Sequence, residues 1–449
     1  DAVDYTHAAR LRCLPERANN HLAASRAQFR DPFREAVALA RDAGLEVHAI
    51  FKPYEGGGVF TVPKGHHLDP PRRQVPCLGG SVEAARVTAE HPAWRLQRRP
   101  WPDDRRLPVT ELEVAFLLDA VTHRSPTTGA VSFARPALAP ADAADALPAR
   151  WSLYASDDNA RYTRLPVRLA CRQAVVTRRV TDANGWTLLP AARCLVVTLS
   201  GCSLAQPYLA LRWSGAKQPR PLIPYSMVRA RHGRRALEVT LSPTFRYEPL
   251  LTREFRGHPP RTGDFRSCGF EFAEPWGSEY GWWDWSVVGL ARGHEPCLRG
   301  ALCEAVPGVR RYWLDQVQGF AAAGCAGVDI RLPSHCSGLR DFSNYGFNPE
   351  LRAAFRRRHG RLPGRSRADV LRLMRVRGAF FTAFLEAARA RLHQQGRTLQ
   401  VHLRACMARP TLGPSYHELG AWYQPKILPD WRRLVDLSDT VILSDNLSE

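Results

Sequence analysis

The chain has 449 residues and a hydrophobic content of 45%, enough to bury the cores of two or three domains. It has no run of 18 apolar residues, which excludes a helix that spans a membrane. Its net charge of +20 comes mainly from arginine spread along the whole chain, which indicates a compositional bias rather than the basic stripe of a nucleic-acid-binding protein.

The first zone, residues 1–108, contains half of a β–α repeat. Asp31 and Pro32 are typical of the cap and the first position of a helix, which we expect to end at Gly44. An apolar strand is predicted at 45–51, followed by a glycine-rich loop with charged residues. We interpret this zone as the first part of a (β/α) barrel.

The second zone, residues 109–255, consists of short β-prone runs separated by turn-forming residues. Many short strands at this spacing are typical of a sandwich or a jelly roll. We therefore predict an inserted all-β domain. The predicted strands are 151–154, 167–170, 174–177, 194–199, 208–213 and 237–241.

The third zone, residues 256–449, returns to alternating helices and strands, which build parallel sheets. No glycine-rich nucleotide-binding motif follows any strand, so the pattern favours an α/β fold of the (β/α)8 TIM-barrel type over a doubly wound sheet. We expect this barrel to be truncated and incomplete at both ends. The predicted helices are 309–323, 348–359, 366–395 and 431–437, and the predicted strands are 327–332, 398–403 and 440–443.

In a parallel barrel the functional side chains lie just beyond the C-terminal ends of the strands. Glycosidases use two carboxylates, one as acid and one as nucleophile or base, and the strand ends offer Glu55, Asp445 and Glu449. We predict catalytic roles for Glu55, Asp445 and His335 in one common cleft. The substrate-binding residues predicted at strand ends are Lys52, Tyr54, Arg331, His402 and Arg404.

Three residues inside strands have two interpretations each. Asp329 and Arg331 alternate along one strand and share a face, where they form either a structural pair or part of the site. His402 lies in an apolar strand, so it is either a hydrogen-bonded core residue or a ligand to substrate.

The segment 276–285 concentrates large aromatic side chains among acidic ones. Flat aromatic faces suit sugar rings, and carboxylates accept strong hydrogen bonds from hydroxyls. Trp282, Trp283 and Trp285 are therefore predicted to bind carbohydrate, with core packing as the alternative.

Several segments share a resemblance, and the most specific is YGFNPELRAAFRRRHGR at 345–361. The others are DPFREAVALARDAGLEVHAIFKPYEGGG at 31–58, EHPAWRLQRR at 90–99, LCEAVPGVRRYWLDQV at 302–317, AGVDIRLPSH at 326–335 and LVDLSDTVIL at 434–443. Together they resemble glycosyl-hydrolase-like (β/α)8 barrel proteins related to glycoside hydrolase family ten. More weakly, WSLYASDDNARYTRL at 151–165 resembles a discoidin-like or carbohydrate-binding jelly roll.

The resemblance assigns places in a barrel to these segments. It implies that 45–51 is strand two, that 302–317 leads into the helix after strand three, that 326–335 is strand four and that 434–443 is strand six. It further implies that strand one is missing or degenerate and that strands seven and eight lie beyond Glu449. Related enzymes carry the acid/base glutamate after strand four, whereas residues 331–335 include no glutamate.

We therefore predict a glycoside hydrolase that acts on a poly- or oligosaccharide by carboxylate acid/base chemistry, or alternatively a non-catalytic carbohydrate-binding protein. Carbohydrate is the expected partner. No nucleic acid, membrane or cofactor is expected. No metal is expected either, because the 11 cysteines have neither CxxC nor zinc-site spacing. The sugar, the oligomeric state and the compartment stay open.

Overall fold

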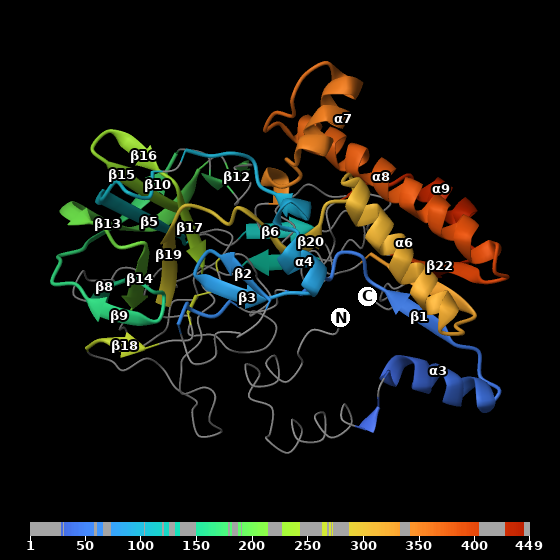
Figure 1. Cartoon of the computed structure of the whole chain (residues 1–449). Helices are drawn as coiled ribbons and strands as arrows, with labels where there is room; N and C mark the ends of the chain where they lie inside the picture. Colours follow the sequence, from blue (N-terminus) through green and yellow to red (C-terminus); the bar gives the residue numbers. More distant parts are fainter. Residues whose placement is uncertain are drawn as a thin grey trace.

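The chain forms a mixed α/β structure with several sheets and, in the described part, six α-helices. Figure 1 shows antiparallel sheets on one side of the molecule and long helices over a parallel sheet on the other. No helix in the described part is both long and apolar enough to cross a membrane. The computed structural model describes residues 28–29, 31–57, 61–65, 73–102, 104–118, 121–124, 131–134, 150–177, 180–181, 187–189, 191–213, 227–242, 263–266, 269–270, 272, 287–332, 342–403 and 427–443.

The parallel sheet has four strands in the order β1-β21-β22-β23, which is also their order in the chain. All three strand pairs are parallel, and their register places Ile50 opposite Asp329 and Arg331 opposite His402. The strands are β1 (His48–Phe51), β21 (Gly327–Arg331), β22 (Thr398–Leu403) and β23 (Thr440–Leu443), and the helices beside them are α3 (Pro32–Asp42), α6 (Pro307–Ala322), α8 (Arg367–His393) and α9 (Trp431–Leu437).

All four of these helices pack on the same face of the sheet. Val328 and Val401 are buried in one core with residues of α6, α8 and α9, and Ala49 packs against Val37 of α3. The alternating pattern of β21 and β22 therefore directs every second side chain away from the helices. This arrangement confirms the helix–strand alternation predicted for the first and third zones, including the helix start at Asp31, whose side chain accepts a hydrogen bond from the backbone N–H of Arg34.

One expectation from the resemblance is wrong. It placed a strand three between strand two and strand four, but β1 and β21 are direct neighbours with nothing between them. The strand that directly precedes α6 in the chain, β20 (Cys297–Leu302), pairs antiparallel with β4 (Arg95–Gln97) in a separate two-stranded sheet. Residues 52–306 consequently form one long insertion between β1 and α6, the helix that leads into β21.

The largest sheets in the described part of this insertion are two antiparallel sheets around a common apolar core. Phe116 and Leu195 from one sheet and Leu153 and Leu211 from the other are buried in this core. The five-stranded sheet contains β10 (Ala170–Val176), β13 (Ala192–Leu204), β5 (Val109–Leu117), β15 (Met227–His232) and β16 (Arg235–Leu237), in that order. The six-stranded sheet contains β17 (Val239–Ser242), β19 (Val287–Arg292), β14 (Tyr208–Trp213), β8 (Trp151–Ser156), β9 (Arg161–Arg164) and β18 (Phe265–Arg266).

The strands predicted within the second zone are confirmed except at 167–169, Thr177 and Glu238, where the described backbone is not a strand. The strand predicted at 237–241 is divided at Glu238, because Leu237 ends β16 in the five-stranded sheet and Val239 begins β17 in the six-stranded sheet. The six-stranded sheet also extends past residue 255, because β18 and β19 belong to it. The smaller elements of the insertion are β2 (Gln74–Cys77) with β3 (Gly80–Glu83), β6 (Val121–Arg124) with β7 (Val131–Ala134), β11 (Val180–Thr181) with β12 (Thr187–Leu189), and the short helix α4 (Arg86–Glu90).

Helices α7 (Pro349–His359) and α8 form a hairpin that connects β21 to β22. With 27 residues α8 is about 40 Å long, whereas a five-residue strand spans about 17 Å. Because α8 returns to the start of β22, its N-terminal part and α7 extend past the C-terminal ends of the strands, as Figure 1 shows. The insertion contacts the hairpin through Arg99, which donates hydrogen bonds to the carbonyls of Pro363 and Gly364.

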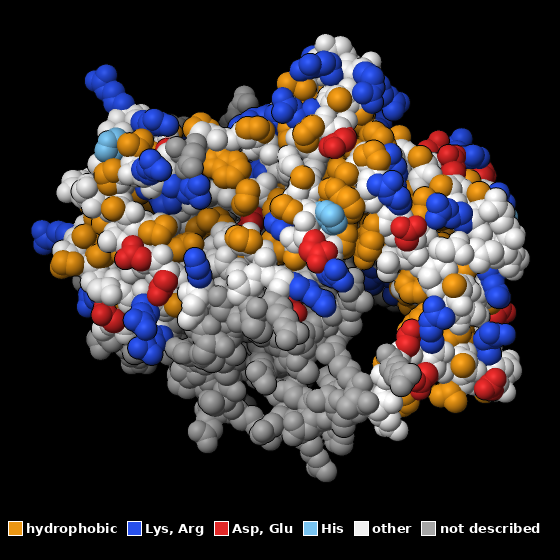
Figure 2. All heavy atoms as spheres, viewed as in Figure 1, with side chains coloured by type: hydrophobic (Ala, Val, Ile, Leu, Met, Phe, Trp, Pro, Cys, Tyr) orange, Lys and Arg blue, Asp and Glu red, His pale blue; other side chains and the backbone are white. Residues whose placement is uncertain are grey.

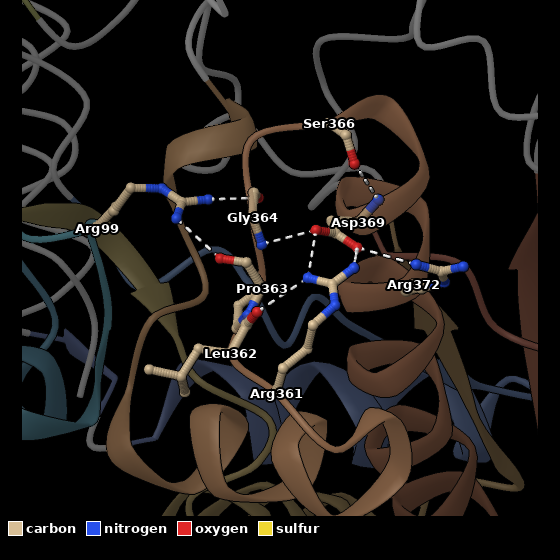
Figure 3. A network of polar contacts seen from close by, with 8 residues as sticks. All are labelled: Arg99, Arg361, Leu362, Pro363, Gly364, Ser366, Asp369 and Arg372. Carbon is tan, nitrogen blue, oxygen red and sulfur yellow. Dashed lines mark hydrogen bonds and ion pairs between the residues drawn. The ribbon is translucent and has the colours of Figure 1, made fainter.

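A carboxylate organises the connection between α7 and α8 (Figure 3). The Asp369 side chain accepts hydrogen bonds from Arg361 at 2.6 and 2.8 Å, from Arg372 at 3.1 Å and from the backbone N–H of Gly364 at 2.8 Å. The backbone N–H of Asp369 in turn donates to Ser366, the N-cap of α8. These donors, Arg361 above all, hold the pKa of Asp369 well below its ordinary value of 3.8.

We expect Asp369→Asn to lower the free energy of unfolding at pH 7 by about 1–2 kcal/mol, since the charged hydrogen bonds lose their acceptor. A carboxylate with a depressed pKa stabilises the fold above its unfolded-state pKa, and this stability disappears as the pH falls through the lower folded-state pKa. The difference in the free energy of unfolding between wild type and variant should therefore become smaller below about pH 4. Urea unfolding at pH 7 and pH 3 measures it, with the exposed Asp436→Asn as control. A gap that is the same at both pH values contradicts this account.

Candidate functional site

The face of the parallel sheet opposite the helices carries polar side chains near the C-terminal ends of β21 and β22. Asp329 and Arg331 point to this face from β21, and Gln400 and His402 lie beside them on β22 because the two strands are paired in register. Ile50 of β1 is 53% exposed on the same face. The sheet thus presents an apolar face to its helices and a charged face to the other side.

Asp329 is the centre of this polar group. One carboxylate oxygen, Oδ2, accepts a hydrogen bond from Arg331 at 3.3 Å and lies 3.6 Å from Nδ1 of His402. Only 4% of the Asp329 side chain is exposed. Its other oxygen, Oδ1, is buried and has no hydrogen-bond partner in the described part of the chain. A buried carboxylate oxygen without a donor is costly, so this atom is suited to accept a hydrogen bond from a ligand.

The end of β1 contributes a second charged pair. Lys52 Nζ lies 2.8 Å from Glu55 Oε2, and about a quarter of each side chain is exposed. The turn is tied to the insertion, because the backbone N–H of Gly56 donates to the carbonyl of Gly300 at 2.8 Å. Gly56 has no space for a side chain, since a Cβ there would overlap the Gly300 carbonyl and the Thr88 hydroxyl. Lys52 and Glu55 are thus held one strand away from Arg331.

Tyr54, expected to bind substrate, is instead a core residue. Its side chain has no exposed surface, its ring packs against Trp313, and its hydroxyl donates to Glu304 Oε2 at 3.2 Å. Glu304 also accepts hydrogen bonds from Arg377 of α8, at 2.6 and 3.3 Å. Burial, followed by the Glu304 charge, raises the pKa of the Tyr54 phenol well above 10.0, so it stays protonated. Tyr54 therefore has a structural role: it anchors the turn after β1 in the core.

The described strand-end residues from the sequence are thus Lys52, Glu55, Arg331 and His402, on three adjacent strands. Their meeting in one cleft stays a prediction. Asp329, left undecided between structure and function, becomes the most informative residue of the site. The predicted residues His335, Asp445, Arg404, Trp282, Trp283 and Trp285 lie outside the described residues.

The side chains described at this site can hydrogen-bond to a hydroxyl-rich or anionic ligand. No group of three or more His, Cys, Asp or Glu side chains that could hold a metal occurs in the described part of the chain. None of the seven cysteines described there forms a disulfide, and burial raises the pKa of several of them, such as Cys297 to about 11, which keeps that thiol protonated. Asp329 can accept a hydroxyl hydrogen bond, and Arg331 and Lys52 can donate to anionic or carbonyl oxygens.

The sequence contains a signal for this group of polar side chains. Polar residues alternate with apolar ones in both GVDIR and TLQVHL, which marks one polar face on two strands that are predicted to be neighbours. The comparisons add no functional information: no protein-family model, curated protein or solved structure matches the chain.

Proposed function

We propose that the parallel sheet is part of a (β/α)8 barrel and that the protein is a glycoside hydrolase whose site includes Asp329. The sequential strand order, with α3, α6, α8 and α9 all on one face, supports a singly wound barrel over a doubly wound sheet, which has helices on both faces. The polar face would then line the barrel interior. The jelly-roll character of the inserted sheets belongs to the same proposal.

The observation that carries the proposed activity is the buried Asp329 carboxylate, which lies two residues before the C-terminal end of β21 and has one oxygen without a hydrogen-bond partner among the described residues. Enzymes with parallel barrels act at this end, and glycosidases use carboxylates there. In our proposal Asp329 accepts a hydrogen bond from a sugar hydroxyl through Oδ1, while Arg331 donates a hydrogen bond to Oδ2. Glu55, which is more exposed, is the candidate acid or base beside it.

We expect the wild type to release reducing ends from at least one member of a panel of xylan, mannan, β-glucan and starch. Asp329→Asn should lower kcat/KM at least tenfold, because the neutral amide is a weaker acceptor. Glu55→Gln provides a second arm with less risk to folding, because Glu55 is partly exposed. Asp315→Asn, on the solvent side of α6 with a 63% exposed side chain, is the matched control. Activity of both site variants at the wild-type level would refute the proposal.

Non-catalytic carbohydrate binding is the second candidate, and one observation favours it. Both described carboxylates at the strand ends are already paired with a cation, Glu55 with Lys52 and Asp329 with Arg331. A carboxylate that is paired with a cation is better suited to accept hydrogen bonds from hydroxyls than to donate a proton. Calorimetric titration of the same sugars separates the two: binding that depends on Asp329 without release of reducing ends identifies a binding protein.

A further inference from the structure

We propose that the exposed arginines of the α7–α8 hairpin bind an anionic polysaccharide that bears uronate or sulfate groups. This inference rests on the proposed function and specifies its substrate class. Residues 349–377 carry ten arginines against two acidic residues, so 29 residues hold a net charge of +8 out of +20 for the chain. Arginine is spread along the sequence, but here the positive charge is concentrated on one surface.

Most of these arginines are turned to solvent. Arg356, Arg357 and Arg358 are exposed in the last turn of α7, and Arg365 and Arg375 are exposed in the connection and on α8. Figure 2 shows basic side chains gathered at the top of the molecule, where Figure 1 places α7. The patch is therefore a surface that a large ligand can reach.

Little negative charge is left to neutralise this surface. Asp369 is already shared by Arg361 and Arg372, and Arg377 is buried with Glu304. Within the described part of the chain, no carboxylate pairs with Arg356, Arg357 or Arg358. Such residues are favourable at a helix C-terminus, but that effect falls off within one turn and does not account for Arg365 or Arg375.

The titration behaviour of nearby groups reflects the same concentration of charge. Slight burial together with Arg372, Arg358 and Arg361 lowers the pKa of His359 below 6.5. Burial, followed by Arg365 and Arg98, lowers the pKa of Arg99 to about 10. In both groups burial is the largest cause, and the arginine charges add to it a field that disfavours further positive charge and that a bound anion would relieve.

The position of the patch indicates a carbohydrate rather than a nucleic acid. The hairpin extends past the C-terminal ends of the strands, on the same edge of the sheet as Asp329 and Arg331, so a long sugar chain can contact both. Guanidinium groups match the geometry of carboxylate and sulfate oxygens, which form two parallel hydrogen bonds with them. Arg331 itself is 30% exposed at the side chain and faces the polar side of the sheet.

The test uses the full chain with polygalacturonate and heparin as anionic probes, dextran as the neutral probe and duplex DNA as the competitor class. We expect both anionic polysaccharides to bind at least tenfold more tightly than dextran at 50 mM salt. In R356Q/R357Q/R358Q this affinity should fall at least tenfold, and the slope of log K against log salt should decrease in magnitude by about two, at about 0.7 per lost contact. The variant R172Q/R234Q/R235Q removes the same charge from the five-stranded sheet and should stay within twofold of wild type.

Equal losses in the two triple variants would overturn the proposal, because they would show attraction by net charge alone. Binding of DNA that is tighter than that of both polysaccharides and equally sensitive to R356Q/R357Q/R358Q would reassign the patch to nucleic acid. The Asp329→Asn assay on neutral sugars is independent of these results. If it succeeds while the hairpin variants have no effect, the proposed hydrolase stands and only the anionic substrate class fails.

Discussion

Replacing Arg377 by methionine should lower the free energy of unfolding by about 3–5 kcal/mol, the loss expected when one partner of a buried ion pair is removed. Arg377 and Glu304 are almost completely buried, and Nε of Arg377 lies 2.6 Å from Oε1 of Glu304. Without the guanidinium, the Glu304 carboxylate keeps only the Tyr54 hydroxyl as a described side-chain donor. Urea unfolding followed by circular dichroism measures the change.

A double variant separates the lost partner from a general defect in packing. In E304Q/R377M no buried charge remains unpaired, so we expect the double variant to lose less stability than the two single variants added together. Arg433→Met removes one partner of an exposed pair with Glu386 at 2.9 Å and should cost less than about 1 kcal/mol. If R377M lowers the free energy of unfolding by less than about 1 kcal/mol, the buried pair contributes no more to stability than a surface pair.

Gly378, the residue after Arg377 in α8, should not tolerate a larger side chain. We expect Gly378→Ala to destabilise the protein by about 2–3 kcal/mol. A Cβ at this buried position of α8 would overlap the Leu428 carbonyl and the nitrogen of Pro429. Both obstacles are backbone atoms of the segment before α9, and the N–H of Leu428 donates to the Met374 carbonyl, so they cannot move without breaking that contact.

Gly319 in α6 provides a control, because the same substitution to Ala should stabilise the protein there. It is exposed within a helix, and a Cβ there meets nothing within 4 Å. Gly319→Ala should therefore stabilise the protein by about 0.5–1 kcal/mol through helix propensity alone. Thermal unfolding of both variants tests the pair, and stabilisation by Gly378→Ala would show that the α8–α9 contact is loose.

The sequence predicted the local elements well where local signals determine them. Pro349 at the start of α7, Gly360 in the left-handed conformation at its end, and Ser366 before α8 are all visible in the sequence. The mixed α/β class follows from the same signals. Strand pairing was harder, because CLRGAL at 297–302 looks like a buried strand yet pairs antiparallel with residues 95–97. Hydrogen-bonding partners two hundred residues apart leave no local trace.

The candidate site, too, could be predicted only where local sequence signals determine it. The strand-end rule selected Lys52, Glu55, Arg331 and His402, which lie on adjacent strands. It also selected Tyr54, whose burial depends on Glu304 and Arg377, residues that are about 250 and 320 positions further along the chain. Asp329 could not be assigned from sequence, because alternation gives a shared face but not whether a carboxylate oxygen is left without a donor.

The long insertion between β1 and α6 has a consequence for the order of folding. The paired residues His48 and Gly327 are 279 positions apart, so direct closure of this loop is slow. If the antiparallel sheets form first, the hydrogen bond from Gly56 to Gly300 brings the two ends of the insertion together before the parallel sheet assembles. The β-rich part of the chain then acts as the folding template for the α/β part, and a slow step in its assembly delays formation of the Asp329 site.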